Sequence, residues 1–203
     1  TGANKVFLSL AKDLDCNLDL HVDETLNAEM LSLRNLAKRI IAKAPTFSVT
    51  ASHCVSLGMQ TKKVQKQVAQ LIAEANIAVV TLPQTNLYLQ GREHQSAMPR
   101  ALTALSALQE AGVTVMAGGD NLQDPFNPMG RADPLEAAAL LVSAGHYFPE
   151  DAYAAVSSKV HECLAKDPPF LAVGSGANFI LTPAESIREF IAFAHQPRSV
   201  FRN

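Results

Sequence analysis

Short strand-like runs alternate with longer amphipathic stretches along most of this chain of 203 residues, and this alternation limits its fold more than any other feature. Four runs rich in β-branched and apolar residues each precede a stretch in which apolar residues recur at helical spacing. The strands are predicted at residues 17–22, 46–51, 77–82 and 113–117, and the helices at residues 28–43, 61–75, 99–111 and 134–144. Strands that alternate with helices form βαβ units, so the pattern predicts an α/β protein with a parallel sheet.

Both ends of the chain depart from this alternation. Additional helices are predicted before the first strand and after the last unit, at residues 3–16 and 149–165. Farther along, short strand-like segments are separated by Gly and Pro, at residues 170–173, 177–181 and 198–201. We therefore predict two parts, a β/α region over residues 1–168 and a set of short C-terminal strands over residues 169–203.

Charge and composition exclude several classes of protein. The 17 Lys and Arg residues are balanced by 19 Asp and Glu residues, which argues against a nucleic-acid binder that needs a basic surface. No apolar run approaches the ~20 residues of a membrane-spanning helix, and no basic segment followed by an apolar one marks an export signal. The three cysteines form no CxxC pair, which favours reduced thiols and a cytoplasmic location; they are Cys16, Cys54 and Cys163.

Residues that bind metals or move protons follow three of the predicted strands. His21 ends the first strand, His53 ends the second, and Asp120 lies just past the fourth. The carboxyl ends of parallel strands form the catalytic face of a β/α barrel, or the ligand crevice of an open sheet. The positions of these residues therefore point to one functional site at that edge.

The spacing of His21 and Glu24 suits a metal-binding imidazole followed by a carboxylate that carries protons. His53 is a candidate for a ligand, or for a group that holds the attacking water or the substrate. Asp120 is placed to bind a metal or to orient a water. Ordinary interpretations remain open beside these: a solvated acidic loop for Glu24, and a ring bonded to a backbone carbonyl for His53.

Four motifs in this order and spacing resemble one family: HVDE at residues 21–24, TASHC at 50–54, LQGR at 89–92, and GGDNLQDPF at 118–126. They make nearly the whole chain similar to the cytosine deaminase branch of the amidohydrolase superfamily. The resemblance implies the C-terminal half of a metal-dependent hydrolase with a (β/α)8 TIM barrel, units five to eight, plus part of a small β-sandwich domain. It also implies a divalent metal cofactor, zinc or iron.

The resemblance further implies a role for each residue of the site. His21 and Asp120 would bind the metal, and Asp120 would also take a proton from the attacking water. Glu24 would carry protons to the ring and the leaving ammonia, and His53 would position the water. The positions implied to bind the substrate are Asn121, Phe126 and Gln90.

Two departures from the family pattern change what is expected. Cytosine deaminases have Asp where this chain has Asn121, and Trp where it has Phe126, so cytosine itself stays in doubt as the substrate. The family's HxH pair, which supplies two more ligands from the first strand, is missing from the chain. The sequence begins at Thr1 without Met, and a complete barrel needs ~250 residues. We therefore expect a fragment that pairs with a missing N-terminal half or forms a homo-oligomer.

Three functions follow from these expectations. The first is hydrolytic deamination of a cytosine-like or related small nitrogen heterocycle by metal-bound hydroxide. The second is a catalytically incomplete fragment, or a pairing module, that lacks the first-strand HxH. The third is an amidohydrolase that cleaves a cyclic amide or another C–N bond. Nucleic acids and membranes are not expected as partners.

Overall fold

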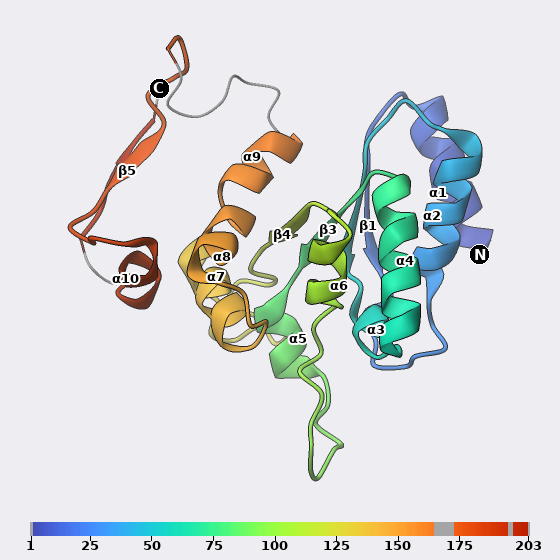
Figure 1. Ribbon diagram of the computed structural model, residues 1–203, viewed down its shortest axis with the longest axis horizontal. Helices are drawn as coiled ribbons and strands as arrows, with labels where there is room; N and C mark the ends of the chain where they lie inside the picture. The colour runs from blue at the N-terminus through green and yellow to red at the C-terminus, as the bar shows by residue number, and fades with distance from the viewer. Residues whose placement is uncertain (1, 165–172, 195–196, 203) are drawn as a thin grey trace.

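A parallel β-sheet forms the centre of the molecule (Figure 1). The computed structural model describes residues 2–164, 173–194 and 197–202, and within them this sheet has four strands. Their order along the chain is also their order across the sheet: β1 (Leu18–Val22), β2 (Val49–His53), β3 (Ile77–Thr81) and β4 (Val115–Ala117). Each neighbouring pair is parallel, so the carboxyl ends of all the strands meet at one edge. The α/β class and the parallel sheet are confirmed.

β2 begins and ends later than the sequence pattern predicts, since the predicted strand covers residues 46–51. The hydrogen-bond register with β1 sets the observed position, because Leu18 pairs with Val49 and Val22 pairs with His53. His53 is the last residue of the observed strand, which agrees with its predicted place at the strand end.

Ten helices in the described ranges accompany the sheet (Figure 1). Five overlap predicted helices: α1 (Gly2–Asp13), α2 (Ser32–Lys43), α4 (Lys62–Glu74), α6 (Leu105–Glu110) and α7 (Pro134–Ser143). The helix predicted at residues 149–165 is divided into α8 (Pro149–Ala155) and α9 (Ser158–Leu164). Three short helices were not predicted: α3 (Val55–Gly58), α5 (Pro83–Leu89) and α10 (Ile187–Ala192). None of the helices in these ranges combines the length and the apolar character that crossing a bilayer requires.

The apolar faces of the helices form a core together with the sheet. α2 contacts α1 and α4, α4 contacts α6, and Figure 1 shows α1, α2 and α4 beside one another next to the strands. The largest fully buried apolar side chains include Leu33, Leu36, Leu57, Ile72, Leu108 and Leu141. Most of them come from the predicted amphipathic stretches, so the helical spacing of apolar residues does mark the faces that pack inward.

The sheet is open at β1, which has a neighbouring strand only on the β2 side within the described residues. Two side chains of this strand, Asp19 and His21, are exposed. Helix α1 contacts β1, and three of its large apolar side chains, Val6, Phe7 and Leu10, are exposed, as is Leu14 just after it. An open parallel sheet with helices packed along it is what half of a β/α barrel provides.

The C-terminal part of the described chain forms a separate small sheet. β5 (Phe179–Leu181) and β6 (Ser199–Phe201) pair in antiparallel fashion, and the rings of Phe179 and Phe201 stack with centroids 4.6 Å apart. Both strands lie within segments predicted to be strands, at residues 177–181 and 198–201. Apart from residue 173, the strand predicted at residues 170–173 lies outside the described residues.

Helix α10 and Arg198 connect this C-terminal part to the β/α region within the described residues. Helix α10 packs on α7 and α8. The Arg198 guanidinium donates to Asp133 Oδ2 over 2.8 Å, and the same Asp133 side chain caps the N-terminus of α7. The division into domains at residue 168 stays a prediction.

Candidate metal centre

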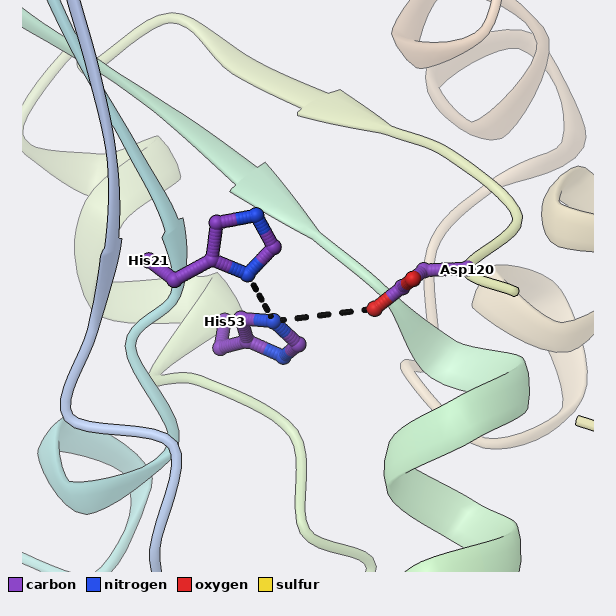
Figure 2. Close-up of side chains that lie close together, drawn as sticks. All are labelled: His21, His53 and Asp120. Carbon is purple, nitrogen blue, oxygen red and sulfur yellow. Dashed lines mark hydrogen bonds and ion pairs between the residues drawn. The ribbon is translucent and has the colours of Figure 1, made fainter. Parts of the chain in front are cut away.

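Three side chains from three strand ends meet at the carboxyl edge of the sheet, as Figure 2 shows. His21 lies on β1, His53 ends β2, and Asp120 follows β4 in the chain. One nitrogen or oxygen atom from each of them lies within 4.8 Å of the others. His21 Nδ1 is 2.8 Å from His53 Nε2, which in turn is 3.7 Å from Asp120 Oδ2. The structure therefore brings together three of the residues that the sequence predicts for the site.

His53 occupies the middle of this group and is fully buried. Its Nε2 atom faces the His21 ring, Glu24 Oε2 at 3.4 Å and Asp120 Oδ2. Its Nδ1 atom lies 3.1 Å from the side-chain oxygen of Asn86 on α5. The backbone of His53 has a φ of 66°, in the left-handed region that residues with a side chain rarely adopt. Such backbone strain persists where surrounding contacts enforce it, often at functional sites.

Glu24 reaches the group from the loop after β1, and its side chain is 39% exposed. Its neighbour Asp23 holds that loop on helix α2. The Asp23 carboxylate accepts hydrogen bonds from the backbone N–H groups of Ser32 and Leu33, at 2.9 and 2.8 Å. Leu31 is at the N-cap position of α2, and its side chain cannot cap the helix. Asp23, eight positions earlier in the chain, therefore accepts the hydrogen bonds from the first N–H groups of the helix.

Asp23→Ala is expected to lower the free energy of unfolding by about 1–2 kcal/mol, because two helix N–H groups lose their acceptor. Urea denaturation measures this change, and Asp23→Asn should cost less because it keeps one accepting oxygen. Asp13→Ala, at an exposed carboxylate on α1, is the control and should shift the value by less than about 0.5 kcal/mol. Equal losses in the two alanine variants would contradict this role for Asp23.

Within the described ranges, no hydrogen bond joins the predicted substrate-binding residues to the three central side chains of the site. The Asn121 amide donates to Asp124 Oδ2 over 2.6 Å. Phe126 is 55% exposed as a residue, and its carbonyl accepts from Thr85 Oγ1. Gln90 is the C-cap residue that follows α5, and its buried Oε1 has no hydrogen-bond partner in the described part of the chain. Their roles stay predictions.

Two further polar residues of the LQGR loop make local contacts instead. The Arg92 guanidinium lies over the Tyr88 ring, 4.3 Å from its centroid, and donates to the Tyr88 carbonyl. His94 pairs with its neighbour Glu93 at 3.5 Å. These contacts favour a role in loop structure for Arg92.

Asn86 is the buried neighbour of the site that the sequence analysis missed. It lies on α5, a helix of seven residues that was itself not predicted. An Asn shortly after a strand is common in turns and carries no specific signal. Only its contact with His53 and its complete burial distinguish it from other loop residues.

The donor set fits one divalent metal ion. Imidazole nitrogens and a carboxylate oxygen suit zinc and iron, and three protein ligands are usual in catalytic zinc sites. Two nitrogens about 2.1 Å from one ion stand about 2.9–3.4 Å apart at angles from 90° to tetrahedral. The distance of 2.8 Å between His21 Nδ1 and His53 Nε2 is close to that range. The sequence analysis assigned ligand roles to His21 and Asp120, and His53 offers a third donor.

The cysteines lie outside this donor set, and all three are free thiols. Cys54 directly follows His53 and is fully buried, with its thiol donating to the carbonyls of Ala51 and Ser52. Burial, and to a smaller extent the charge of Asp23, raises the pKa of the Cys54 thiol well above its ordinary value. The nucleophilic thiolate is therefore suppressed at this position.

Iodoacetamide is expected to alkylate Cys16, which is exposed, in the native protein and to leave Cys54 unmodified until the protein is unfolded. Mass spectrometry of peptides after timed labelling measures both rates. Labelling in urea is the control that shows Cys54 to be chemically competent. Modification of native Cys54 at the rate of Cys16 would contradict the burial described above.

The sequence of the chain is similar to those of known hydrolases. Residues 3–196 match the amidohydrolase family. The chain is 36% identical over 191 residues to a pterin deaminase of Rhizobium rhizogenes, and the match covers 92% of this chain and 44% of that protein. The chain thus spans less than half the length of this curated relative.

Solved structures agree in fold. The structure of 5-methylcytosine deaminase from Klebsiella pneumoniae matches with a TM-score of 0.88 at 23% identity, over 99% of this chain and 50% of that one. The structure of N-isopropylammelide isopropylaminohydrolase from Burkholderia multivorans matches with a TM-score of 0.81 at 27% identity, over 99% and 49%. The sequence match over nearly all of the chain and the shared fold lead to one conclusion: the chain belongs to the amidohydrolase family.

Proposed function

We propose that this chain carries the catalytic half of a metal-dependent hydrolase that removes an amino group from a small nitrogen heterocycle and releases ammonia. The observation that carries the proposal is the meeting of His21, His53 and Asp120 at the carboxyl edge of the sheet, with Glu24 beside them. This edge is where β/α enzymes place their active sites. The family match and the deaminases among the relatives support the same reaction class.

Each side chain of the site would have its own role in such a reaction. His21 and Asp120 would hold a divalent ion, zinc or iron, which when bound supplies Lewis-acid activation of water. Asp120, whose side chain is 27% exposed, would accept a proton from the attacking water. His53 would orient that water from the buried side of the site.

Glu24 would deliver protons on the exposed side of the site. Its carboxyl group would protonate a ring nitrogen of the substrate and then the departing amine, so that water adds across the C–N bond and ammonia leaves. A side chain that is partly exposed can reach an incoming heterocycle and still lie 3.4 Å from His53 Nε2. Proton transfer by one positioned carboxyl group typically contributes about 10²–10⁴-fold to the rate.

For the substrate we favour a pterin-like ring over cytosine. The relative with 36% identity is a pterin deaminase, and Asn121 stands where cytosine deaminases have Asp. An amide offers a donor as well as an acceptor to the ring edge. The exposed Phe126 ring would stack on a planar substrate, and Gln90 would contribute its unpaired amide oxygen.

The open sheet supports a partner segment beside β1. This strand is unpaired on one side within the described residues, and α1 exposes a row of apolar side chains next to it. Unpaired edges and apolar patches are usually covered in stable proteins. We propose that an N-terminal half of the barrel, or a second copy of the chain, covers them in a cytoplasmic enzyme. A pairing module without its own activity is the second candidate function.

Metal analysis combined with product analysis tests the proposal. The protein with its full natural chain is loaded with zinc or iron(II) and incubated with pterin, cytosine and a cyclic amide. Bound metal and ammonia release, fastest from pterin, is the expected result. A carboxylate product without ammonia would instead identify a cyclic-amide hydrolase, and the absence of both metal and product would favour the pairing module.

A further inference from the structure

We infer that Asn127 is a positioning residue that fixes the direction in which Asp120 presents its carboxylate to the metal site. This inference deepens the proposed function and rests on the proposed role of Asp120 as a metal ligand. It is carried by one buried side chain, because the Asn127 amide nitrogen donates to the carbonyls of Asp120 and Asn121, over 3.3 and 2.8 Å. Asn127 is only 4% exposed, so water competes little for these bonds.

The partners of the Asn127 amide determine its orientation. Backbone carbonyls only accept hydrogen bonds, so the nitrogen of the amide, and not its oxygen, must face them. A side-chain amide has two hydrogens, which can serve the two successive carbonyls of Asp120 and Asn121. Bonds to both carbonyls restrict the backbone around Asp120, and with it the direction of the bond from Cα to Cβ.

Asn127 is itself held in place by Asp124. One oxygen of the Asp124 carboxylate accepts from the backbone N–H of Asn127 over 2.9 Å, and the other accepts from the Asn121 side chain over 2.6 Å. From outside the loop, Thr85 Oγ1 on α5 donates to the Phe126 carbonyl over 3.2 Å. Hydrogen bonds from within the loop and from α5 therefore keep Asn127 next to the backbone that it holds.

Gly130 leaves room for the bond between Asn127 and Asn121. A Cβ atom at Gly130 would lie 2.5 Å from the Asn121 carbonyl oxygen and 2.7 Å from Asn127 Nδ2, the two atoms that this hydrogen bond joins. Both distances are too short for a carbon atom, so a larger residue would push the two partners apart. Glycine is the residue that permits such a close approach. Gly130 therefore offers a second, independent way to disturb the same bond.

The carboxylate of Asp120 depends on this support from its backbone. Its Oδ2 lies 3.7 Å from His53 Nε2, and Figure 2 shows it pointing toward that ring. Within the described ranges the carboxylate accepts no hydrogen bond, so the backbone determines where it points. Residues that support a metal ligand typically contribute about 10–100-fold to metal affinity. Loss of the Asn127 bonds should therefore weaken metal binding through Asp120.

The test compares two variants of Asn127 in the protein with its full natural chain. Asn127→Asp keeps the shape of the side chain but replaces its N–H donors with an acceptor, and Asn127→Leu removes the polar atoms. For each we expect zinc affinity, measured by chelator competition, to fall by about 10–100-fold. The visible spectrum of the cobalt(II)-loaded protein should also change, because it depends on the geometry of the ligands. A residue that only filled space would leave both measurements unchanged.

Gly130→Ala should produce the same two changes although it leaves Asn127 intact, and it carries the test if the Asn127 variants do not fold. Asn4→Asp is the matched control, since Asn4 is another buried Asn, on α1, whose amide donates to the Ser32 carbonyl. It makes the same chemical change and should leave zinc affinity and the cobalt spectrum unchanged. Urea denaturation shows whether each variant is folded.

Wild-type zinc affinity in folded Asn127→Asp or Gly130→Ala would overturn the inference. A crystal structure of metal-free Asn127→Asp tests it without any metal. We expect the distance from Asp120 Oδ2 to His53 Nε2 to exceed about 4 Å, the limit for an ion pair, and an unchanged distance would also overturn the inference. Failure of the deaminase proposal alone would appear as missing ammonia release from the wild type with these results intact.

Discussion

Asp120→Ala is expected to remove both the bound metal and the turnover of the protein. Asp120 is the one carboxylate in the group of three donors, and its Oδ2 faces His53 Nε2. Residues that only support metal ligands cost about 10–100-fold in affinity, so the loss of a ligand should weaken zinc binding by more than about 100-fold. Loss of the proton acceptor should add to the loss of rate. Zinc content after dialysis and the rate of ammonia release measure the two effects.

Two further variants make this result specific. Asp120→Asn keeps the size of the side chain but removes its charge and basicity, so it should bind metal weakly and remain inactive. Asp151→Asn is the control, because that half-buried carboxylate on α8 accepts from Gln109 and is not among the three donors. Full metal content and normal turnover in Asp120→Ala would show that Asp120 neither binds the metal nor takes part in the reaction.

Glu24→Gln is expected to lower kcat by about 10²–10⁴-fold while metal binding changes little. Glutamine has the shape of glutamate and forms hydrogen bonds, but it cannot carry a proton between the water, the ring and the amine. Glu24 lies next to His53 and stands outside the group of three donors. Steady-state kinetics and zinc content, measured on the same preparation, separate the two effects.

Glu29→Gln serves as the matched control for Glu24, since it makes the same change at an exposed residue of the same loop. It should retain full activity. If Glu24→Gln lost its metal, Glu24 would be a ligand and not a proton carrier. If it kept normal kcat, another group would supply the protons. Together the two variants distinguish a residue that holds the metal from one that moves protons.

Elements with strong periodicity were predicted well from the sequence. The strands rich in Val, Ile and Ala and the helices α2, α4 and α7 fall close to their predicted ranges, because repeated burial of one face imposes a spacing on the apolar residues. The helices α3 and α5 were not predicted, since they have four and seven residues and too few turns to show a period. The pattern also placed β2 too early, because pairing with β1 decides where it starts.

Part of the site could likewise be predicted from the sequence, and part could not. The positions of His21, Glu24, His53 and Asp120 after successive strands were sufficient to predict one site at the carboxyl edge. The place of His53 Nε2 between His21 and Asp120 was not settled by the sequence, since it depends on the register of β1 and β2. Asn86 was not predicted at all, since nothing in its neighbourhood along the chain marks it.

The sequence alone therefore determined the α/β class and the order of the elements, because these depend on local spacing. It also determined that imidazole and carboxylate side chains lie at the carboxyl edge of the sheet, because parallel strands share one direction. Only the tertiary structure decided which atoms meet. The 2.8 Å contact between His21 and His53 and the buried bond from His53 to Asn86 join residues that are 32 and 33 positions apart. Such contacts follow from strand register and helix packing, and no local pattern in the chain encodes them.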